Sequence, residues 1–233
     1  MSIIEFKNVS KSFDSLVVLD GLSFQVEKGE ILAIVGPSGT GKSVTLKHIV
    51  GLLDPDEGEV KVSGKPRIGY LFQSGALLAW MTVYENVALP LKETTKLKDK
   101  EIEELVMAAL REVGLEDAAD KYPGEISGGM QKRAGLARAI VRRADVVLYD
   151  EPTSGLDPVT TLTIHKLIRK LNRDHGITSI VVTHDIQGAI HLADRIMLIK
   201  DGKAVETSKV EDFVQSANPV VQEFLEAMKG ELK

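Results

Sequence analysis

The chain contains no cysteine among its 233 residues. Disulfide bonds, thiolate nucleophiles and cysteine-ligated metal sites are therefore excluded. The sequence also lacks long hydrophobic runs, since apolar stretches such as Ile31–Val35 and Val146–Leu148 have only the length of a strand. A membrane-spanning helix needs roughly 20 consecutive apolar residues, so we expect no direct membrane span.

The chain also has fewer basic than acidic residues, with 29 Lys and Arg and 34 Asp and Glu, which gives a formal net charge of -5. This balance argues against nucleic acid as the principal partner. The segment Met1–Val9 alternates apolar and charged residues and lacks the basic-then-apolar layout of a signal peptide. With 43% hydrophobic residues, the chain is long enough to bury the core of one globular α/β domain. We expect it to stay inside the cell.

The strongest pattern is a glycine-rich segment that follows the apolar run Ile31–Val35 and precedes a helix-like stretch. It fits the phosphate-binding loop, which is a glycine, four free positions and then Gly-Lys-Ser. Glycines let backbone N–H groups approach phosphate oxygens, and the following helix adds its positive N-terminal end. Lys42 would reach the β- and γ-phosphates, and the Ser43 hydroxyl would bind Mg²⁺. The predicted nucleotide-binding residues here are Gly36, Pro37, Ser38, Gly39, Thr40, Gly41, Lys42, Ser43 and, on the helix, Thr45.

Two acidic residues end the apolar stretch Ala144–Tyr149, which we interpret as a buried strand. A buried carboxylate without a partner costs free energy, so a cation is expected beside Asp150 and Glu151. Mg²⁺ at the phosphate loop supplies that cation, with Asp150 as a ligand and Glu151 placed to orient and deprotonate a water molecule. The strand predicted over Ser179–Val182 places His184 at the same sheet edge, which favours a functional role.

Three other features are ambiguous when the residues are taken alone. Phe13, upstream of the phosphate loop, is either a core residue or an aromatic ring that stacks on adenine. Gln73 either ends a strand or serves the site. The segment Ser127–Gly129 begins a helix of small residues and is a second potential anion site, but many helices begin in this way.

The remaining periodicities predict alternating strands and helices. Asp99–Val113 has the i, i+3, i+4, i+7 pattern of an amphipathic helix. The single tryptophan, Trp80, lies in the apolar cluster Leu77–Met81, which favours core packing over an interface. The other predicted elements are strands over 3–9, 22–26, 58–62 and 68–72, two strands over 195–207, a helix over 159–172 and two helical pieces over 210–229 divided at Asn218-Pro219.

Six signals in this order resemble the ATP-binding subunits of ABC transporters, and the resemblance covers nearly the whole chain. They are Phe13, the phosphate loop, Gln73, Ser127–Gly129, Asp150-Glu151 and His184. The resemblance implies an α/β fold, namely a P-loop NTPase (RecA-like) core with a β-rich N-terminal subdomain and an inserted helical subdomain. It assigns residues 1–75 and 142–210 to the nucleotide-binding core, 76–141 to the helical subdomain and 211–233 to C-terminal helices.

The resemblance also implies a role for each matched residue. Phe13 would stack on adenine, and Gln73 would link the Mg²⁺ site to the membrane partner. Glu151 would be the catalytic base, and His184 would contact the γ-phosphate. The catalytic set is then Glu151, His184, Gln73 and Lys42, the metal ligands are Ser43, Gln73 and Asp150, and a turn at a dimer interface comprises Ser154, Gly155, Leu156 and Asp157.

In the family, a signature segment binds the γ-phosphate held by the opposite subunit, and here that segment is Ser127, Gly128, Gly129 and Met130. The resemblance therefore implies a second copy of the chain related by C2 symmetry. ATP would favour the closed dimer because it touches both halves, and hydrolysis would release them. Met130 stands where the family usually has glutamine. Because this change leaves the glycine N–H groups intact, we expect activity.

Three stretches are similar to the ATPases of bacterial Mla/Mce-type phospholipid transporters, namely Ile126–Ala139, Gln73–Leu77 and Asn218-Pro219 followed by Phe224-Leu225. This similarity implies phospholipid transport between membranes, with integral membrane permease subunits and an Mce-type lipid-binding protein. The chain would then lie peripherally on the cytoplasmic face of the inner membrane. The alternative is an importer ATPase for a polar solute such as an amino acid. A non-transport ATPase, such as a translation factor or DNA-repair ATPase, is disfavoured by the single cassette and the absence of coiled-coil heptads.

Overall fold

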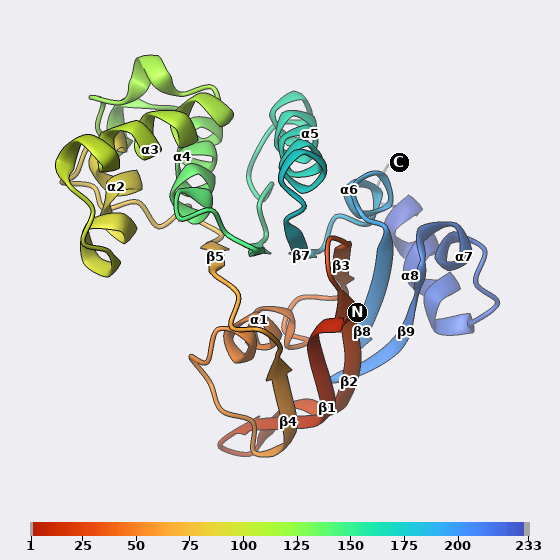
Figure 1. The fold of residues 1–233 in the computed structure, drawn as a ribbon. Helices are drawn as coiled ribbons and strands as arrows, with labels where there is room; N and C mark the ends of the chain where they lie inside the picture. Colours follow the sequence, from red (N-terminus) through yellow and green to blue (C-terminus); the bar gives the residue numbers. More distant parts are fainter. Residues whose placement is uncertain (1, 231–233) are drawn as a thin grey trace.

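The computed structural model describes residues 2–230 and contains two β-sheets, with a group of helices to one side (Figure 1). The first sheet is antiparallel, in the order β2-β1-β4. Its strands are β1 (Ser2–Phe13), β2 (Leu16–Glu27) and β4 (Glu57–Val62). The first two run further than predicted, to a hairpin where Phe13 pairs with Leu16. The side chains at this tip are exposed, so no alternation of buried and exposed positions marks the ends of the strands.

The second sheet has the order β5-β6-β7-β3-β8-β9, and only its edge strand β9 is antiparallel to its neighbour. Its strands are β3 (Ile31–Val35), β5 (Ile68–Leu71), β6 (Val146–Asp150), β7 (Thr178–Thr183), β8 (Arg195–Lys200) and β9 (Lys203–Lys209). Every residue of β3 is buried, as its continuous apolar sequence predicts. Because β5, β6, β7 and β3 are parallel neighbours, the residues that follow them meet at one sheet edge.

Alternate residues of β3 face two hydrophobic cores. Leu32 and Ile34 pack with the antiparallel sheet and α1 (Lys42–Ile49). On the other face, Ala33 belongs to the core that includes residues of α5 (Pro158–His175) and α6 (Ile186–Leu192). A parallel sheet covered on both faces explains the fully apolar sequence of β3 and confirms the predicted α/β class.

The helical group comprises α2 (Val83–Thr94), α3 (Asp99–Glu112) and α4 (Gly128–Ile140), with 3-10 turns at Glu116–Ala118 and Pro123–Glu125 (Figure 1). The amphipathic pattern of α3 is confirmed, because Ile102, Val106, Ala109 and Leu110 are buried. These helices fall within residues 76–141, which we assigned to a helical subdomain. The division of the chain into subdomains stays a prediction.

Two helices, α7 (Val210–Val214) and α8 (Pro219–Gly230), follow the second sheet. The predicted break between them is confirmed, since Asn218 Oδ1 accepts a hydrogen bond from the Val220 N–H at 2.9 Å and proline begins the next helix. Residues 231–233 of the predicted C-terminal helices lie outside the described residues. Between residues 2 and 230, no helix is both long enough and apolar enough to cross a membrane.

Candidate active site

The glycine-rich loop connects β3 to α1, as predicted. Gly36 must be a glycine, because an added Cβ would lie 2.2 Å from the carbonyl oxygen of Ile199. Gly41, at the N-cap of α1, has φ of 91° and gives the helix no side-chain cap. The first N–H groups of a helix have no intrahelical acceptors, so this uncapped end can receive an anion.

Lys42 is the first residue of α1, and its side chain reaches back into the glycine-rich loop. Its side chain is 7% exposed, and Nζ donates to the carbonyl oxygens of Gly36 and Pro37 at 2.8 Å each. Burial lowers the pKa of the Lys42 ammonium, while the Glu151 and Asp150 carboxylates oppose that shift. The cation is therefore held where the loop would enclose phosphate oxygens. Thr45 is fully buried and donates its hydroxyl to the Gly41 carbonyl at 3.0 Å, which supports the start of the helix.

Both carboxylate oxygens of Asp150 accept hydrogen bonds. Ser43 Oγ donates to Oδ1 at 2.8 Å, and the Tyr70 hydroxyl donates to Oδ2 at 3.2 Å. Burial, with the nearby Asp150 carboxylate, raises the pKa of the Tyr70 hydroxyl, which therefore stays a donor. Ser43 and Asp150 offer the hard oxygen ligands that Mg²⁺ prefers, so these residues fit the predicted metal site.

Glu151 and His184 follow neighbouring parallel strands and contact each other. His184 Nδ1 lies 2.9 Å from Glu151 Oε2, and the Thr183 hydroxyl donates to the same oxygen at 3.4 Å. His184 is exposed, whereas the Glu151 side chain is only 13% exposed. The structure therefore brings together four predicted residues, namely Ser43, Asp150, Glu151 and His184, at the sheet edge beside Lys42.

Phe13 lies at the tip of the β1-β2 hairpin. Phe13 is 42% exposed, and Lys11 Nζ lies 5.7 Å from the ring centroid. The exposure excludes the core alternative and leaves a ring face that a base can stack on.

The segment predicted as a second anion site caps α4. The Ser127 hydroxyl accepts a hydrogen bond from the Met130 N–H at 3.3 Å. Gly129 packs so closely on α5 that an added Cβ would lie 2.5 Å from Cγ2 of Thr160. Met130 is half-buried against the core. In the described part of the chain, no hydrogen bond joins residues 127–130 to the phosphate loop.

The family described as ABC transporter matches residues 19–154. The chain belongs to the ABC transporter family. It is similar to the intermembrane phospholipid transport system ATP-binding protein MlaF of Haemophilus influenzae, with 41% identity over 99% of this chain and 91% of that protein. It is also 42% identical to the probable ribonucleotide transport ATP-binding protein mkl of Mycobacterium leprae, over 95% of this chain and 68% of that protein.

A solved structure supports the same assignment. The chain resembles the dimeric post-hydrolysis state of the ATP-binding cassette MJ0796 bound to ADP and Pi, with a TM-score of 0.82 and 33% identity over 89% of this chain and 98% of that chain. The predicted P-loop NTPase fold is therefore confirmed, and the chain is an ABC-type ATPase.

Gln73 and the predicted dimer turn of this ABC ATPase contact each other. Gln73 is exposed, and its Nε2 donates to Ser154 Oγ at 3.5 Å. The structure therefore places Gln73 against the turn and not against Ser43 or Asp150. At the end of the turn, Asp157 caps α5 by accepting hydrogen bonds from the N–H groups of Val159 and Thr160 at 3.0 Å each.

The prediction that Trp80 packs in the core is wrong. Its side chain is 72% exposed, although Leu77 packs partly against the core. Trp80 is exposed because of the conformation of the loop before α2. Asn86 fixes that conformation through hydrogen bonds to the backbone of Leu78 and Met81. Trp80 lies in the turn at the outside of this loop, so the ABC cassette presents an aromatic ring on its surface.

Three residues that contact the site received no role in it from the sequence. Tyr70 lies on β5, where period-two alternation places it on one face, but nothing in its strand marks it as a partner of Asp150. Thr183 ends β7 and was expected at the same sheet edge as His184, but nothing in the sequence marks it as a partner of Glu151. Lys132 is a basic residue in a helix of small residues, a pattern that usually means a solvated charge, yet it is only 5% exposed.

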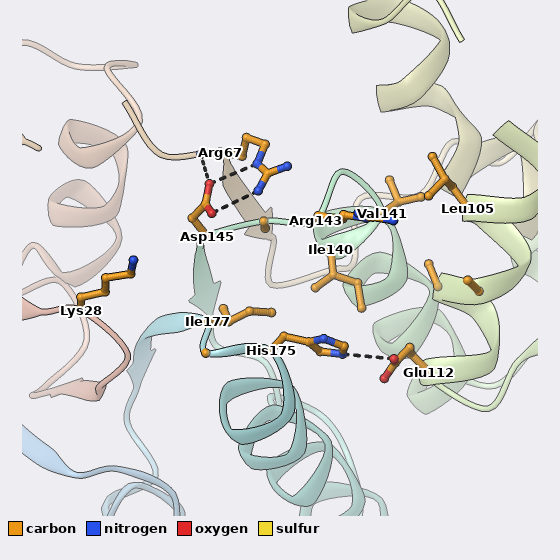
Figure 2. Close-up of a pocket in the computed structure, with 14 residues that line it drawn as sticks. Lys28, Arg67, Leu105, Glu112, Ile140, Val141, Arg143, Asp145, His175 and Ile177 are labelled. Atoms are coloured by element: carbon orange, nitrogen blue, oxygen red, sulfur yellow. Dashed lines mark hydrogen bonds and ion pairs between the residues drawn. The ribbon is translucent and has the colours of Figure 1, made fainter. Parts of the chain in front are cut away.

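A cleft of about 580 Å³ lies away from these residues, at the opposite ends of the parallel strands (Figure 2). At its rim, Arg67 forms a two-pronged ion pair with Asp145 at 3.1 Å. On the other side, His175 of α5 lies 3.1 Å from Glu112 of α3. None of the residues that line the cleft was predicted to bind nucleotide, so its volume does not mark the ATPase site.

Proposed function

We propose that this chain is the ATP-hydrolysing subunit of a transporter that moves phospholipid between bacterial membranes. The observation that carries the proposal is the similarity to MlaF over nearly the whole of both chains. Family membership alone supports only an ABC-type ATPase. The lipid substrate is inferred from the function for which that relative is named.

The proposed assembly contains two copies of the chain, integral membrane permease subunits and an Mce-type lipid-binding protein. The dimeric state of the similar MJ0796 cassette supports the pairing. The absence of a membrane-crossing helix within residues 2–230 supports peripheral attachment, which we place at the cytoplasmic face of the inner membrane. Trp80 and the half-buried Leu77 and Met81 provide an exposed apolar surface for the permease.

In this proposal the loop Gly36–Ser43 holds the phosphates of ATP. Its backbone N–H groups and the uncapped start of α1 bind phosphate oxygens, and the Lys42 ammonium turns from the loop carbonyls to the β- and γ-phosphates. Phe13 stacks on adenine. Ser43 and Asp150 would hold Mg²⁺. Gln73, which contacts Ser154 in this structure, is proposed to join them when the nucleotide binds. The ion would neutralise the charge on the phosphates. The small number of protein ligands suits Mg²⁺, which usually takes its other ligands from phosphate and water.

Glu151 is the proposed general base. Its Oε2 atom contacts His184 and Thr183, while Oε1 has no hydrogen-bond partner among the described residues and is free to accept a proton from the attacking water. His184 is exposed on the other side of this contact and is placed to donate to a γ-phosphate oxygen. The arrangement orients the water and receives its proton at one carboxylate.

Each ATP is proposed to lie between the phosphate loop of one copy and Ser127–Met130 of the other. This arrangement explains why one chain carries two separate anion sites. Among residues 2–230, no hydrogen bond joins the phosphate loop to Ser127–Met130. The ligand then stabilises the closed pair because it contacts both copies. Loss of the shared phosphate removes that stabilisation and lets the pair open.

A second candidate is the ATPase of an importer for a polar solute. The observation that favours it is the similarity to mkl, a protein named for probable ribonucleotide transport. This candidate shares every proposed catalytic residue and differs in the surface that meets the permease, including the stretch Leu77–Met81.

The deciding experiment purifies the chain with its native membrane partners in mild detergent and identifies the proteins and bound lipids by mass spectrometry. We expect a permease, an Mce-type protein and phospholipid. A permease for a polar solute without bound phospholipid would retain the ATPase and reject the lipid assignment.

A further inference from the structure

Lys132 is a buried cation whose partners are backbone carbonyls. Its side chain is 5% exposed, and Nζ donates to the carbonyl oxygen of Gln73 and, at 3.2 Å, to that of Glu151. Burial lowers the pKa of the Lys132 ammonium, while the Glu151 and Asp150 carboxylates oppose that shift. A buried ammonium is costly unless its protons find acceptors, so Lys132 and these carbonyls hold each other in place.

The contacts of Lys132 join three parts of the chain. Gln73 lies beyond the end of β5, and Glu151 follows β6, its parallel neighbour. Lys132 itself lies in the second turn of α4, the helix that Ser127 caps. The Lys132 side chain therefore connects α4, the helix that begins at the signature segment, to the ends of two adjacent strands at the site.

The backbone of Glu151 needs this support. Its φ is 48°, in the left-handed region that is disfavoured for residues with a Cβ. It also precedes Pro152, which restricts its backbone further. Its N–H donates to the Val182 carbonyl at 2.9 Å. The strained residue is thus held by β7 on its N–H side, and its carbonyl accepts hydrogen bonds from Lys132 Nζ and from the Ser154 N–H, at 3.2 Å each.

We propose that Lys132 is a positioning residue that sets the orientation of Glu151, an inference that rests on the proposed role of Glu151 as the base. Together with the Ser154 N–H, Lys132 holds the Glu151 carbonyl and so fixes the direction in which the carboxylate leaves the backbone. Because α4 begins at Ser127–Gly129, a shift of the signature segment on nucleotide bound by the other copy moves Lys132 as well. The base at one ATP site therefore responds to the occupancy of the other site.

The test compares three variants of Lys132 in the full chain, purified with its membrane partners. K132M keeps the length of the side chain but removes the charge and the donors, K132Q keeps donors without charge, and K132R keeps both. For each variant we would measure kcat, KM for ATP, and the dissociation constant of a non-hydrolysable ATP analogue. We expect K132M to lower kcat by about 10²-fold, because a small displacement of a catalytic group has an effect of this size. The affinity for the analogue stays unchanged, and K132R restores most of the turnover.

Two neighbouring cations on α4 serve as matched controls. Arg133 donates to the carbonyl oxygens of Val113 and Gly114 at 2.9 and 3.0 Å, so R133M should keep the wild-type kcat. Arg138 donates at 2.7 Å to the carbonyl oxygens of Gly75 and Ala76, which belong to the same loop as Gln73. R138M should therefore lose less turnover than K132M. An equal loss would assign the effect to the loop and overturn the role at Glu151.

Further outcomes separate this inference from the proposed catalytic role. Wild-type kcat in K132M, beside an inactive Glu151→Gln variant, would overturn the inference and leave the base assignment intact. Normal turnover in Glu151→Gln would instead remove the base assignment. Circular dichroism and thermal melting establish that each variant folds. If K132M does not fold, K132Q carries the test, and a wild-type kcat in K132Q with folded protein rejects any need for the cation.

Discussion

His184 Nδ1 lies 2.9 Å from Oε2 of Glu151, just beyond the ends of two paired parallel strands. Thr183, the last residue of β7, donates its hydroxyl to the same oxygen at 3.4 Å. One carboxylate oxygen is thus anchored by β7 and the residue after it, and the other is available to a water molecule. Glu151 and His184 meet in this way because β6 and β7 are parallel neighbours and end at the same edge of the sheet.

The first prediction concerns the base. Glu151→Gln keeps the shape of the side chain and its contact distance to His184 but removes the ability to take a proton. Turnover should fall by about 10²- to 10⁴-fold, the usual contribution of a positioned base. Binding of ATP, measured by calorimetry, should persist because the phosphate loop is unchanged. Turnover close to that of the wild type would contradict the assignment.

The second prediction concerns the loop cation. Lys42→Ala removes the buried ammonium that lies against the Gly36 and Pro37 carbonyls, so the phosphates lose a charged partner. We expect weaker ATP binding and a large loss of turnover. Lys47→Ala is the matched control, because Lys47 lies exposed on the same helix and should leave both quantities near their wild-type values. Undiminished ATPase activity in Lys42→Ala would refute its role.

The third prediction concerns the exposed ring of Phe13. Phe13→Ala should lower the affinity for ATP, since stacking of a base on an aromatic side chain contributes about 1–3 kcal/mol. Phe13→Trp should preserve the affinity. The melting temperature should change little in either variant, because Phe13 is 42% exposed. Leu16→Ala, at the facing position of the hairpin, is the control, and an equal loss of affinity there would indicate a general effect of the hairpin.

The fourth prediction concerns the partner of Asp150 that the sequence did not reveal. Tyr70→Phe removes the hydroxyl that donates to Asp150 Oδ2 and keeps the ring that stacks on Phe72 at 4.3 Å between centroids. A hydrogen bond to a charged group contributes about 1.5–3 kcal/mol, so Asp150 becomes less well oriented. We expect a higher Mg²⁺ concentration for half-maximal ATP binding in a titration. Tyr84→Phe, in α2, should leave that concentration unchanged.

Local patterns were sufficient to predict most elements of this fold. The loop between β3 and α1, the amphipathic α3 and the break before Pro219 each carry a signal within a short window. Trp80 and Lys132 could not be placed in this way. The exposure of Trp80 depends on the loop that Asn86 holds before α2, and the burial of Lys132 depends on the carbonyl of Glu151, 19 residues further along the chain. A hydrophobic residue in a turn and a cation in a helix have no local feature that reveals such contacts.

The same limit applies to the candidate site. Ser43 was predicted from the phosphate-loop motif, whereas Asp150, Glu151 and His184 were predicted from their positions at the ends of strands, because a parallel sheet brings such residues together. The contact of Gln73 with Ser154 was not predicted. It depends on the path of two loops after β5 and β6, and loop paths follow from tertiary packing that periodicity does not encode.

The last prediction tests the contact between the signature segment and α5. A Cβ at position 129 would lie 2.5 Å from Cγ2 of Thr160, so Gly129→Ala should lower the melting temperature despite the better helix propensity of alanine. Thr160→Ser removes that methyl group but keeps the hydroxyl that hydrogen-bonds to Asp157. In the Thr160→Ser background, Gly129→Ala should therefore be neutral or stabilising. A double-mutant cycle should give a coupling of about 1–2 kcal/mol. The same change in melting temperature in both backgrounds would mean that the close approach does not limit residue 129, and that glycine is needed there for the ligand alone.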